Sequence, residues 1–468
     1  MQRLTGLDAT FLYLETPRNH MHVGGVEIFD PSTVPGGYSF EKLRALVEER
    51  LPRMPPFRRR LVEIPFQIHH PLWVEDPDFD LHYHLRRAAL PAPGGYGELA
   101  EFAEEFMGRP LDRTRPLWEM YVLEGLEGGM IAVVSKVHHA AIDGVSGAEL
   151  VVNLLDLQPE PTPVTEPDTW KPDRIPTDVE LVAFAMSSLA RQPLAAAKSI
   201  RRTAEMALTL RRRNRQPGVN PPPAPLTAPR TSLNTTITPH RRVAFAEVSL
   251  DDVKVVKNAL GGTVNDVVLT LCSSALRTYL VENGELPDRS LVGMVPISVR
   301  TEDQKGAMGN QVSAMLVSLA TDVDDPVERF HAVTAATKAA KEQDRAIGAQ
   351  TLSNWTEFAA PAVAARAARL YSNMRIADRH NPLFNVTISN VPGPNFPLYC
   401  AGARMVAMYP MGPIFDGAGL NITVMSYMGS MHFGLVACRE TVPRVWDIAH
   451  HLGDALEQLT KAATTAGS

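Results

Sequence analysis

Met130-Ile-Ala-Val-Val-Ser-Lys-Val-His-His-Ala-Ala-Ile-Asp-Gly144 decides the fold, because this stretch joins a strand to a helix through a polar turn. Residues 130–137 are apolar and rich in β-branched side chains, which predicts a strand. Downstream, Ser146 and Glu149 have the spacing of a capping box and open an apolar run that predicts a helix. Two histidines, a carboxylate and a glycine therefore lie where a strand ends in a loop.

The two histidines of this stretch are adjacent, so on a continuing strand they point to opposite faces. His139 shares its face with Val133 and Val137, while His138 shares the other face with Lys136. Only one histidine can then face a buried cavity, and the alternation favours His139. An imidazole has the pKa range to take a proton from a hydroxyl near neutral pH and to return it later. We therefore predict that His139 is a general base, with His138 beside it in the catalytic motif.

Three simpler or different roles compete for these residues. Asp143-Gly144 after a strand is typical of a plain turn. His139 and Asp143 could both bind zinc or iron, but the sequence has no HExxH or CxxC motif and its three cysteines stand far apart. A serine nucleophile requires a GxSxG elbow, and Gly144-Val-Ser-Gly147 is one residue short of it. General base remains the strongest chemical role, and we expect no metal site.

The segment His138-His-Ala-Ala-Ile-Asp-Gly144 resembles the HHxxxDG motif of the acyl-CoA-dependent acyltransferase superfamily, which includes chloramphenicol acetyltransferase and the condensation domains of nonribosomal peptide synthetases. Further segments make the resemblance more specific, to the bacterial wax ester synthase/diacylglycerol acyltransferase family. They follow one another along nearly the whole chain: Leu4-Thr-Gly-Leu-Asp-Ala-Thr-Phe-Leu12, Met21-His-Val-Gly-Gly25, Arg115-Pro-Leu-Trp118, Asn265-Asp-Val-Val-Leu269 and Ser389-Asn-Val-Pro-Gly-Pro394.

The resemblance implies an α/β fold of two chloramphenicol acetyltransferase-like sandwich domains, joined by a long linker with a helical segment and enclosing an active-site tunnel. A chain of 468 residues is too long for one core, and 45% hydrophobic residues can fill two. Helix and strand patterns also alternate in both halves. We expect an N-terminal domain at 1–157, the linker at 158–232 and a C-terminal domain at 233–468. Strands are predicted at 23–29, 120–123, 130–137 and 242–248, and helices at 39–51, at 97–107 and after Thr263.

The linker is dense in proline at 158–176 and at 217–229, which predicts tethers without regular structure. Residues 177–214 between them predict one or two amphipathic helices. The end of this region, Ser199–Arg215, concentrates arginines beside apolar residues. Two roles stay open for it: a helix packed across the two domains, and an interfacial helix that docks on lipid.

Two further motifs supply candidate substrate-binding residues. Asn265 and Asp266 lie in the first turn of a predicted helix, where the carboxylate is explained by the helix dipole alone. The same helix end also favours a nearby oxyanion, to which Asn265 could donate a hydrogen bond, and the resemblance favours that role. Pro116, Leu117 and Trp118 are most simply a core anchor at the start of a strand. The resemblance implies that they lie near the acyl-binding region.

Asp143 could orient a histidine, as the carboxylate of a Ser-His-Asp triad does. The resemblance instead implies a structural role, in which Asp143 points away from the cavity and holds the loop through an arginine. We expect Arg300 to be that arginine. Gly144 then serves a backbone conformation or a close approach that a Cβ would prevent.

The sequence thus predicts a long-chain acyl-CoA-dependent O-acyltransferase that acylates diacylglycerol or a fatty alcohol, with acyl-CoA as co-substrate and no metal or redox cofactor. A net charge of −6 and a pI near 6.2 give no electrostatic signature for nucleic acid. Three widely spaced cysteines and no leader pattern predict a cytoplasmic protein. No apolar run has the length to span a bilayer, so we expect peripheral contact with the inner face of the membrane and with lipid droplets.

Two alternatives stay open at this point. One is a condensation-type enzyme that receives acyl groups from a carrier protein, and the other is a lipid-droplet-binding protein with the same fold and no turnover. The intact HHAAIDG segment argues against the second. The oligomeric state is not predicted.

Overall fold

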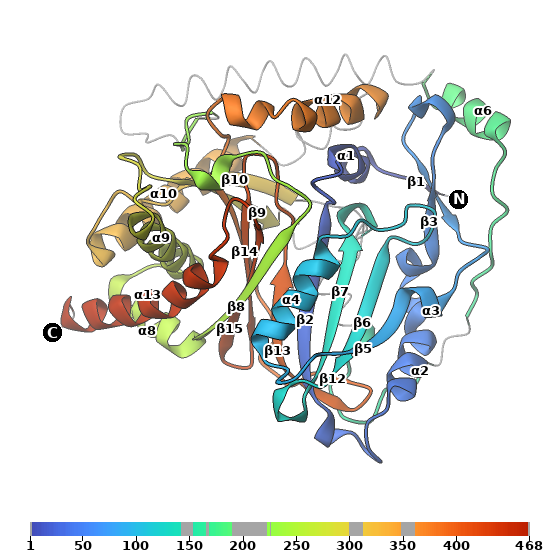
Figure 1. Ribbon diagram of the computed structural model, residues 1–468, viewed down its shortest axis with the longest axis horizontal. Coiled ribbons are helices and arrows are strands. Elements are labelled where there is room, and N and C mark those ends of the chain that lie inside the picture. Colours follow the sequence, from blue (N-terminus) through green and yellow to red (C-terminus); the bar gives the residue numbers. More distant parts are fainter. Residues whose placement is uncertain are drawn as a thin grey trace.

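The computed structural model describes residues 2–141, 153–164, 168–189, 222–224, 226–298, 312–347 and 361–466. Two six-stranded sheets lie side by side in the middle of the molecule, and helices flank them (Figure 1). This arrangement confirms the predicted α/β class.

The sheet of the N-terminal half has the strand order β12-β13-β2-β7-β6-β5. Its strands are β2 (His22–Asp30), β5 (Leu85–Ala89), β6 (Trp118–Glu124), β7 (Ile131–His138), β12 (Tyr399–Cys400) and β13 (Ala403–Met411). Apolar residues on both faces explain why β7 is central: Val133 and Val137 face one core, and Ala132 and Val134 face another. The strands predicted at 23–29, 120–123 and 130–137 are confirmed.

The helices of the N-terminal half are α1 (Gly6–Leu14), α2 (Phe40–Arg50), α3 (Leu81–His84) and α4 (Tyr96–Met107). A small sheet of β1 (Gln2–Arg3), β3 (Arg59–Val62) and β4 (Leu72–Glu75) lies beside them, in the order β1-β4-β3. Thr5 caps α1 and Ser39 caps α2 through their side-chain oxygens, which fixes where these helices begin. The helices predicted at 39–51 and 97–107 are confirmed.

The sheet of the C-terminal half has the order β10-β9-β11-β14-β15-β8. Its strands are β8 (Arg241–Ser249), β9 (Val292–Ser298), β10 (Val312–Ser318), β11 (Val386–Val391), β14 (Leu420–Tyr427) and β15 (Ser430–Cys438). Four helices lie together on its outer side (Figure 1): α8 (Leu250–Leu260), α9 (Val264–Glu282), α10 (Pro326–Ile347) and α13 (Val445–Ala466). The strand predicted at 242–248 and the helix predicted after Thr263 are confirmed.

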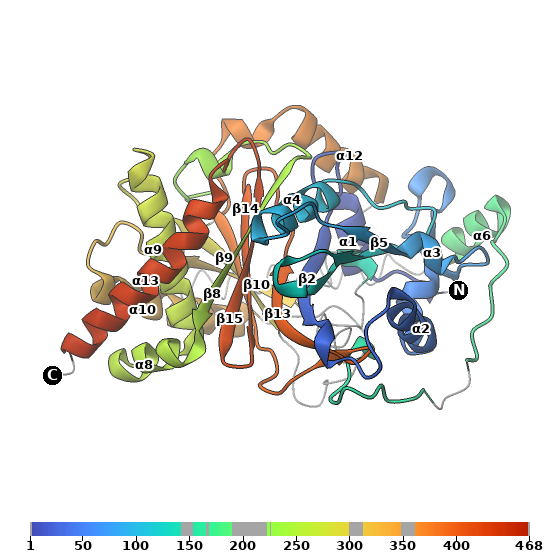
Figure 2. The same ribbon diagram turned by 60° about the horizontal axis from the view of Figure 1, so that its bottom comes forward.

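The two halves exchange elements. β13 comes late in the sequence yet pairs with β2 of the N-terminal sheet, with Met408 opposite Glu27. In return, α4 of the N-terminal half packs against β8 (Figure 2). The sheets therefore do not follow the order of the chain, and the boundaries 1–157, 158–232 and 233–468 stay predictions.

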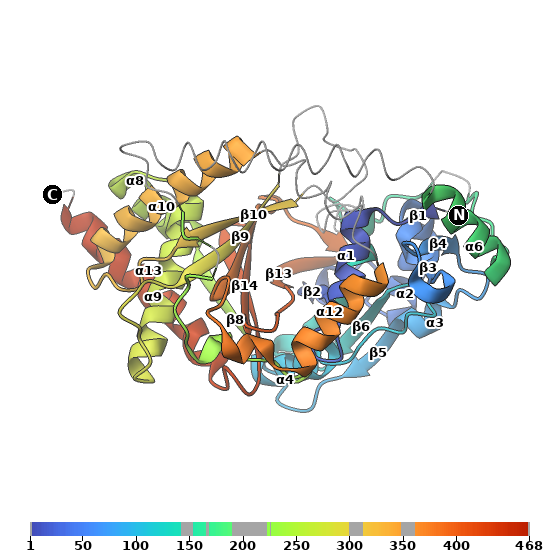
Figure 3. The same cartoon turned by 90° about the horizontal axis from the view of Figure 1, so that it is seen from above.

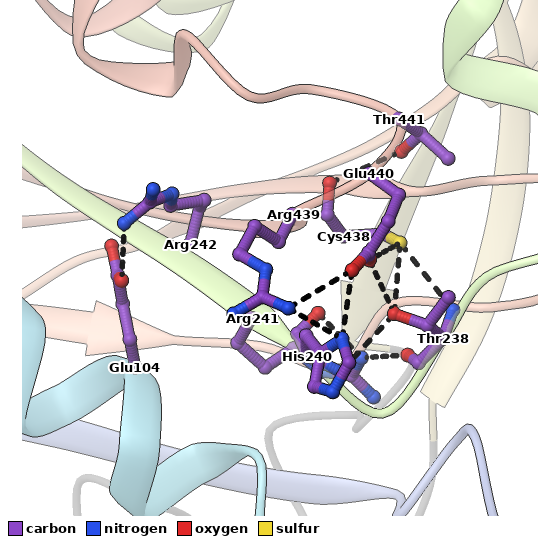
Figure 4. A network of polar contacts seen from close by, with 9 residues as sticks. All are labelled: Glu104, Thr238, His240, Arg241, Arg242, Cys438, Arg439, Glu440 and Thr441. Carbon is purple, nitrogen blue, oxygen red and sulfur yellow. Dashed lines mark hydrogen bonds and ion pairs between the residues drawn. The ribbon is translucent and has the colours of Figure 1, made fainter.

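A polar network fixes α4 to β8 (Figure 4). Glu104 of α4 accepts hydrogen bonds from the Arg242 guanidinium at 2.9 Å and from the Val243 backbone N–H at 3.0 Å. At the beginning of the same strand, the His240 ring lies 2.7 Å from the Glu440 carboxylate, which also accepts from Thr238. The Glu104 contacts join the two halves, while those of His240 hold the start of β8 within the C-terminal half.

A second contact between the halves involves α12 (Pro361–Asn373), which lies beside α1 (Figure 3). The Arg18 guanidinium, just after α1, donates to the Ser372 carbonyl at 2.6 Å. On its other side, the Arg18 carbonyl accepts a hydrogen bond from Arg241 of β8 at 2.6 Å. The segment that follows α1 is therefore held by both halves.

The first part of the predicted linker lies against the N-terminal half. The Thr162 carbonyl accepts a hydrogen bond from the Arg50 guanidinium of α2, and just before the linker Asp156 forms a fully buried ion pair with the same guanidinium at 2.6 Å. Farther on, α6 (Asp178–Leu189) falls within the region predicted to be helical, while Ser199–Arg215 lies outside the described residues. Within the described ranges, no single helix is long and apolar enough to cross a bilayer; α8 and α9 meet that test only as a pair bent by 102°.

Candidate active site

The end of β7 places the two histidines. β7 ends at His138, and His139 opens a short 3-10 helix over residues 139–141. His139 lies one residue past the strand, yet it stacks on Phe11, which packs against the core of Val133 and Val137, the face that strand alternation predicts. The His138 N–H donates to the Leu117 carbonyl and the His139 N–H to the Met21 carbonyl, both at 2.9 Å. The motif segments at 115–118 and 21–25 thus hold the backbone of the motif segment at 138–144.

His138 is fully buried, and its ring makes two defined contacts. Nδ1 accepts the Ala140 N–H at 3.0 Å, and Nε2 lies 3.2 Å from the Glu15 carboxylate. Because Nδ1 is an acceptor, the proton of the neutral ring belongs on Nε2, facing Glu15. Burial lowers the pKa of His138, and the hydrogen bond and charge of Glu15 oppose that shift. Nδ1 is therefore occupied, and Nε2 is buried against Glu15, so neither nitrogen is placed to take a substrate proton.

Glu15 follows α1 directly and belongs to an ion-pair network. Arg113 donates to its carboxylate through Nε at 3.0 Å and also binds the Leu12 carbonyl at 3.0 Å. Burial alone would raise the pKa of Glu15, but the bonds and charges of His138 and Arg113 outweigh it and lower the pKa. Sequence reasoning missed Glu15 and Arg113. Glu15 lies between two of the quoted segments and Arg113 just before a third, but neither belongs to a pattern of its own.

His139 is half-buried and stacks on Phe11 of α1, with ring centroids 3.9 Å apart and planes at 18°. Its Nδ1 is buried without a hydrogen-bond partner, and its Nε2 has no partner among the described residues either. Burial lowers the pKa of His139 to about 4, so the ring is neutral at neutral pH. His139 is therefore the histidine whose free nitrogen can accept a proton.

Further buried bases lie on the same sheet. His22 of β2 pairs with His138 across the ladder, and neither of its ring nitrogens has a hydrogen-bond partner within the described ranges. The Lys136 ammonium donates to the carbonyls of Phe106 at 3.1 Å and Arg109 at 3.0 Å, and burial lowers its pKa to about 8. No group of three potential metal ligands occurs in the described residues.

The Pro116-Leu117-Trp118 segment is a core anchor, as predicted. Trp118 opens β6 and is buried, its indole N–H donates to the Phe57 carbonyl at 2.9 Å, and its ring stacks on His84. Leu117 is fully buried and binds the His138 backbone through its carbonyl. This segment acts on the histidines through the backbone, and a contact with the acyl group stays a prediction.

Asn265 and Asp266 have separate contacts at the start of α9. Asp266 and Thr263 form a reciprocal capping box, in which Asp266 accepts the Thr263 N–H at 2.9 Å. Asn265 is half-buried, and its side-chain oxygen lies 3.5 Å from the Asn390 amide nitrogen. Asn390 belongs to the quoted Ser389–Pro394 segment. Asp266 is thus placed to cap the helix, while the Asn265 amide nitrogen has no partner among the described residues.

Asp143, Gly144 and Arg300 lie outside the described residues, which omit 142–152 and 299–311. The pairing of Asp143 with Arg300 and the backbone role of Gly144 therefore stay predictions.

Comparison with known proteins assigns almost the whole chain to the family that the sequence motifs indicate. The family profile of the wax ester synthase/diacylglycerol acyltransferase catalytic domain matches residues 4–268, and that of the family's C-terminal domain matches residues 308–460. A putative diacylglycerol O-acyltransferase of Mycobacterium tuberculosis H37Rv is 38% identical over 465 residues, covering 99% of this chain and 91% of that protein. A probable diacylglycerol O-acyltransferase of the same strain is 36% identical over 469 residues, covering 97% and 98%.

Solved structures give the same result. The wax ester synthase/diacylglycerol acyltransferase of Marinobacter aquaeolei VT8 superposes with a TM-score of 0.69 at 31% identity, covering 99% of this chain and all of that one. This match confirms the predicted fold of two chloramphenicol acetyltransferase-like domains. The starter condensation domain of rhizomide synthetase superposes with a TM-score of 0.54 at 11% identity, covering 100% and 95%, and so shares the fold alone. The carrier-protein alternative is not favoured.

Proposed function

This chain belongs to the wax ester synthase/diacylglycerol acyltransferase family of acyltransferases, and we propose that it moves a long-chain acyl group from coenzyme A to the hydroxyl of diacylglycerol or a fatty alcohol, with His139 as the general base. One observation carries the assignment of the base. His139 stands on the turn after β7 with a neutral ring whose Nε2 has no partner among the described residues, while His138 Nδ1 accepts the Ala140 N–H and His138 Nε2 is buried against Glu15.

In the proposed reaction, His139 Nε2 takes the acceptor hydroxyl proton as the oxygen attacks the thioester carbonyl. The carbon–oxygen bond forms, and the carbonyl oxygen becomes an oxyanion. The oxyanion then collapses, the carbon–sulfur bond breaks, and the imidazolium returns its proton to the departing thiolate. The products are an ester and free coenzyme A, so no acyl-enzyme is required.

The N-terminus of α9 is our candidate for stabilising the oxyanion. Free backbone N–H groups and the helix dipole favour negative charge at such an end, and a well-placed donor contributes about 10²–10³-fold to the rate. The Asn265 amide is the side-chain donor at this end that the described contacts leave available. The proposed chemistry uses acyl-CoA as co-substrate and calls for no metal or redox group.

A turnover screen tests the proposed reaction. Palmitoyl- and oleoyl-coenzyme A are offered with diacylglycerol, hexadecanol and a short alcohol, and both released coenzyme A and ester are measured. We expect ester from one or both long-chain acceptors. Turnover only with carrier-bound acyl groups, or no turnover with any pair, would contradict the proposal.

We also propose a cytoplasmic protein that associates peripherally with the inner face of the membrane and with lipid droplets. The support is the sequence of Ser199–Arg215, in which each arginine near an anionic surface contributes about 1 kcal/mol. Replacing Arg211, Arg212, Arg213 and Arg215 with glutamine should release most of the protein from anionic vesicles in a sedimentation assay. Unchanged sedimentation would end the proposed lipid-docking role of this segment.

A further inference from the structure

The helix α1 and the residue that caps it contact both histidines of the catalytic turn. Phe11 of α1 stacks on the His139 ring, and Glu15, directly after α1, lies 3.2 Å from His138 Nε2. The two side chains are four positions apart, so they lie on the same face of the helix. Glu15 offers a charge to His138, whereas Phe11 offers His139 the face of an aromatic ring.

Both partners of this stack are fixed in place by their backbones. Thr5 caps the first turn of α1, and α12 packs along the side of the helix (Figure 3). In the last turn of α1, the Leu12 carbonyl accepts a hydrogen bond from Arg113 at 3.0 Å. On the other side of the stack, the backbone N–H of His139 donates to the Met21 carbonyl at 2.9 Å. The geometry of the stack is therefore set by the fold and does not depend on a bound substrate.

The rings of Phe11 and His139 lie closer together than any other ring pair in the described part of the chain. Their centroids are 3.9 Å apart and their planes are at 18°, whereas the next closest pairs lie at 4.7 Å. Two neutral aromatic rings prefer offset or edge-to-face arrangements with centroids about 4.5–7 Å apart, because their negative faces repel each other. A cation within about 6 Å is instead attracted to such a face. The geometry therefore favours the imidazolium form of His139 over the neutral imidazole.

The proposed reaction passes through that imidazolium, and the surroundings of His139 oppose it. Burial lowers the pKa of His139 to about 4 and the charge of His138 lowers it further, while a general base works best with a pKa near the operating pH. The other titratable groups around the turn are engaged elsewhere: Asp8 with Thr5, Tyr13 with His70, Glu15 with Arg113, and His22 beside His138. Within the described residues, no carboxylate contacts the His139 ring, whereas the Phe11 ring does.

We infer that Phe11 is a positioning residue of the proposed reaction, whose ring face orients the His139 imidazole and stabilises the imidazolium that forms when Nε2 takes the acceptor proton. Phe11 acts through His139, and no bond forms or breaks at Phe11 itself. The inference rests on the proposed function only in taking His139 as the base. In the competing role, Phe11 merely fills space, and any apolar side chain of similar size would replace it.

Changing the electrons of the ring without its shape separates the two roles. Mono-, di- and trifluorinated phenylalanine at position 11 weaken the negative ring face in steps and keep nearly the same size. A titration between pH 4 and pH 7 follows the Cε1 NMR resonance of His139, which is identified by its loss in His139→Gln. We expect protonation to become harder with each added fluorine and easier in Phe11→Trp, because Trp has the strongest such face. The same titration for every ring would overturn the inference. Since this readout needs no substrate, it decides the role of Phe11 whether or not acyl transfer is observed.

Kinetics and a matched control complete the experiment. Phe11→Leu keeps an apolar side chain but removes the aromatic face, so kcat should fall by about 2–30-fold with KM unchanged. A loss confined to KM, or no loss, would contradict the inferred role.

Phe79→Leu is the control, because Phe79 also stacks on a histidine, His84, with planes at 11° and centroids 5.5 Å apart. It should leave the titration of His139 and kcat unchanged, and an effect equal to that of Phe11→Leu would overturn the inference. If Phe11→Leu does not fold, the fluorinated rings, which preserve the packing, provide the test.

Discussion

The two sheets differ in what they bury. The N-terminal sheet and the segment leading into it bury ionisable groups: His20, His22, Lys136 and His138. The C-terminal sheet packs mainly aliphatic side chains against α9, α10 and α13. Burial lowers the pKa of these histidines and keeps their rings neutral near pH 7. In the proposed mechanism, the first sheet carries the proton chemistry, while the second supplies the helix end at Asn265.

The largest effect should come from the base itself. His139→Ala should lower kcat by about 10²–10⁴-fold, the usual contribution of a positioned base, with little change in melting temperature. His138→Ala should retain measurable activity, since neither nitrogen of that ring is placed to take a substrate proton. Steady-state kinetics and thermal unfolding of both variants provide the check. Near-normal rates in His139→Ala would place the chemistry outside this turn.

The next largest effect should come from Glu15, which we expect to act as a positioning residue through His138. Glu15→Gln should lower kcat by about tenfold and leave KM unchanged, because it loses a charged hydrogen bond that orients the motif. Glu15→Asp should recover part of the rate if positioning is the cause. A change confined to KM would contradict this role.

Glu15 also predicts a pH dependence of stability. The folded pKa of Glu15 is lowered, so its contribution is present above its ordinary pKa of about 4.3 and is lost as the pH falls through the folded value. Denaturant unfolding between pH 3 and pH 6 should therefore be less pH-dependent in Glu15→Gln than in the wild type. Parallel profiles would show that the ion pair has no such coupling to folding.

Glu27 should shift stability in the opposite direction. Its folded pKa is raised to about 8, so its contribution is fully present below about pH 4.3 and is lost as the pH rises toward 8. Glu27→Gln should flatten this decline over pH 5–8, as measured by denaturant midpoints. A decline of the same slope in Glu27→Gln would mean that another group is responsible.

The smallest effects should separate two neighbours in the C-terminal half. Thr263→Ala removes a helix cap and should cost about 1 kcal/mol of stability with kcat unchanged. Asn265→Ala should instead lower kcat with an unchanged melting temperature if the α9 end stabilises the oxyanion. Unchanged kinetics in Asn265→Ala would exclude Asn265 as the oxyanion donor. The residues that carry the chemistry would then lie on the N-terminal sheet.

Local patterns were enough to predict most of the elements. Apolar alternation and helical spacing located β2, β6, β7, β8, α2 and α4 within one or two residues, because these periodicities depend only on neighbours in the sequence. The strand predicted at 130–137 runs one residue further, to His138, and leaves His139 on a short 3-10 turn. Local spacing does not show this, since pairing with β2 and the hydrogen bond from His139 to Met21 decide where the ladder ends.

The sequence alone determined the motif and its chemistry: two histidines after a buried strand, a capped helix at Asn265, and the family to which these segments belong. Only the tertiary structure decided which partners surround them. Glu15 reaches His138 from 123 positions away, and β13 joins a sheet begun by β2. Such contacts depend on how distant surfaces pack to bury apolar area, and no local spacing in the chain encodes them.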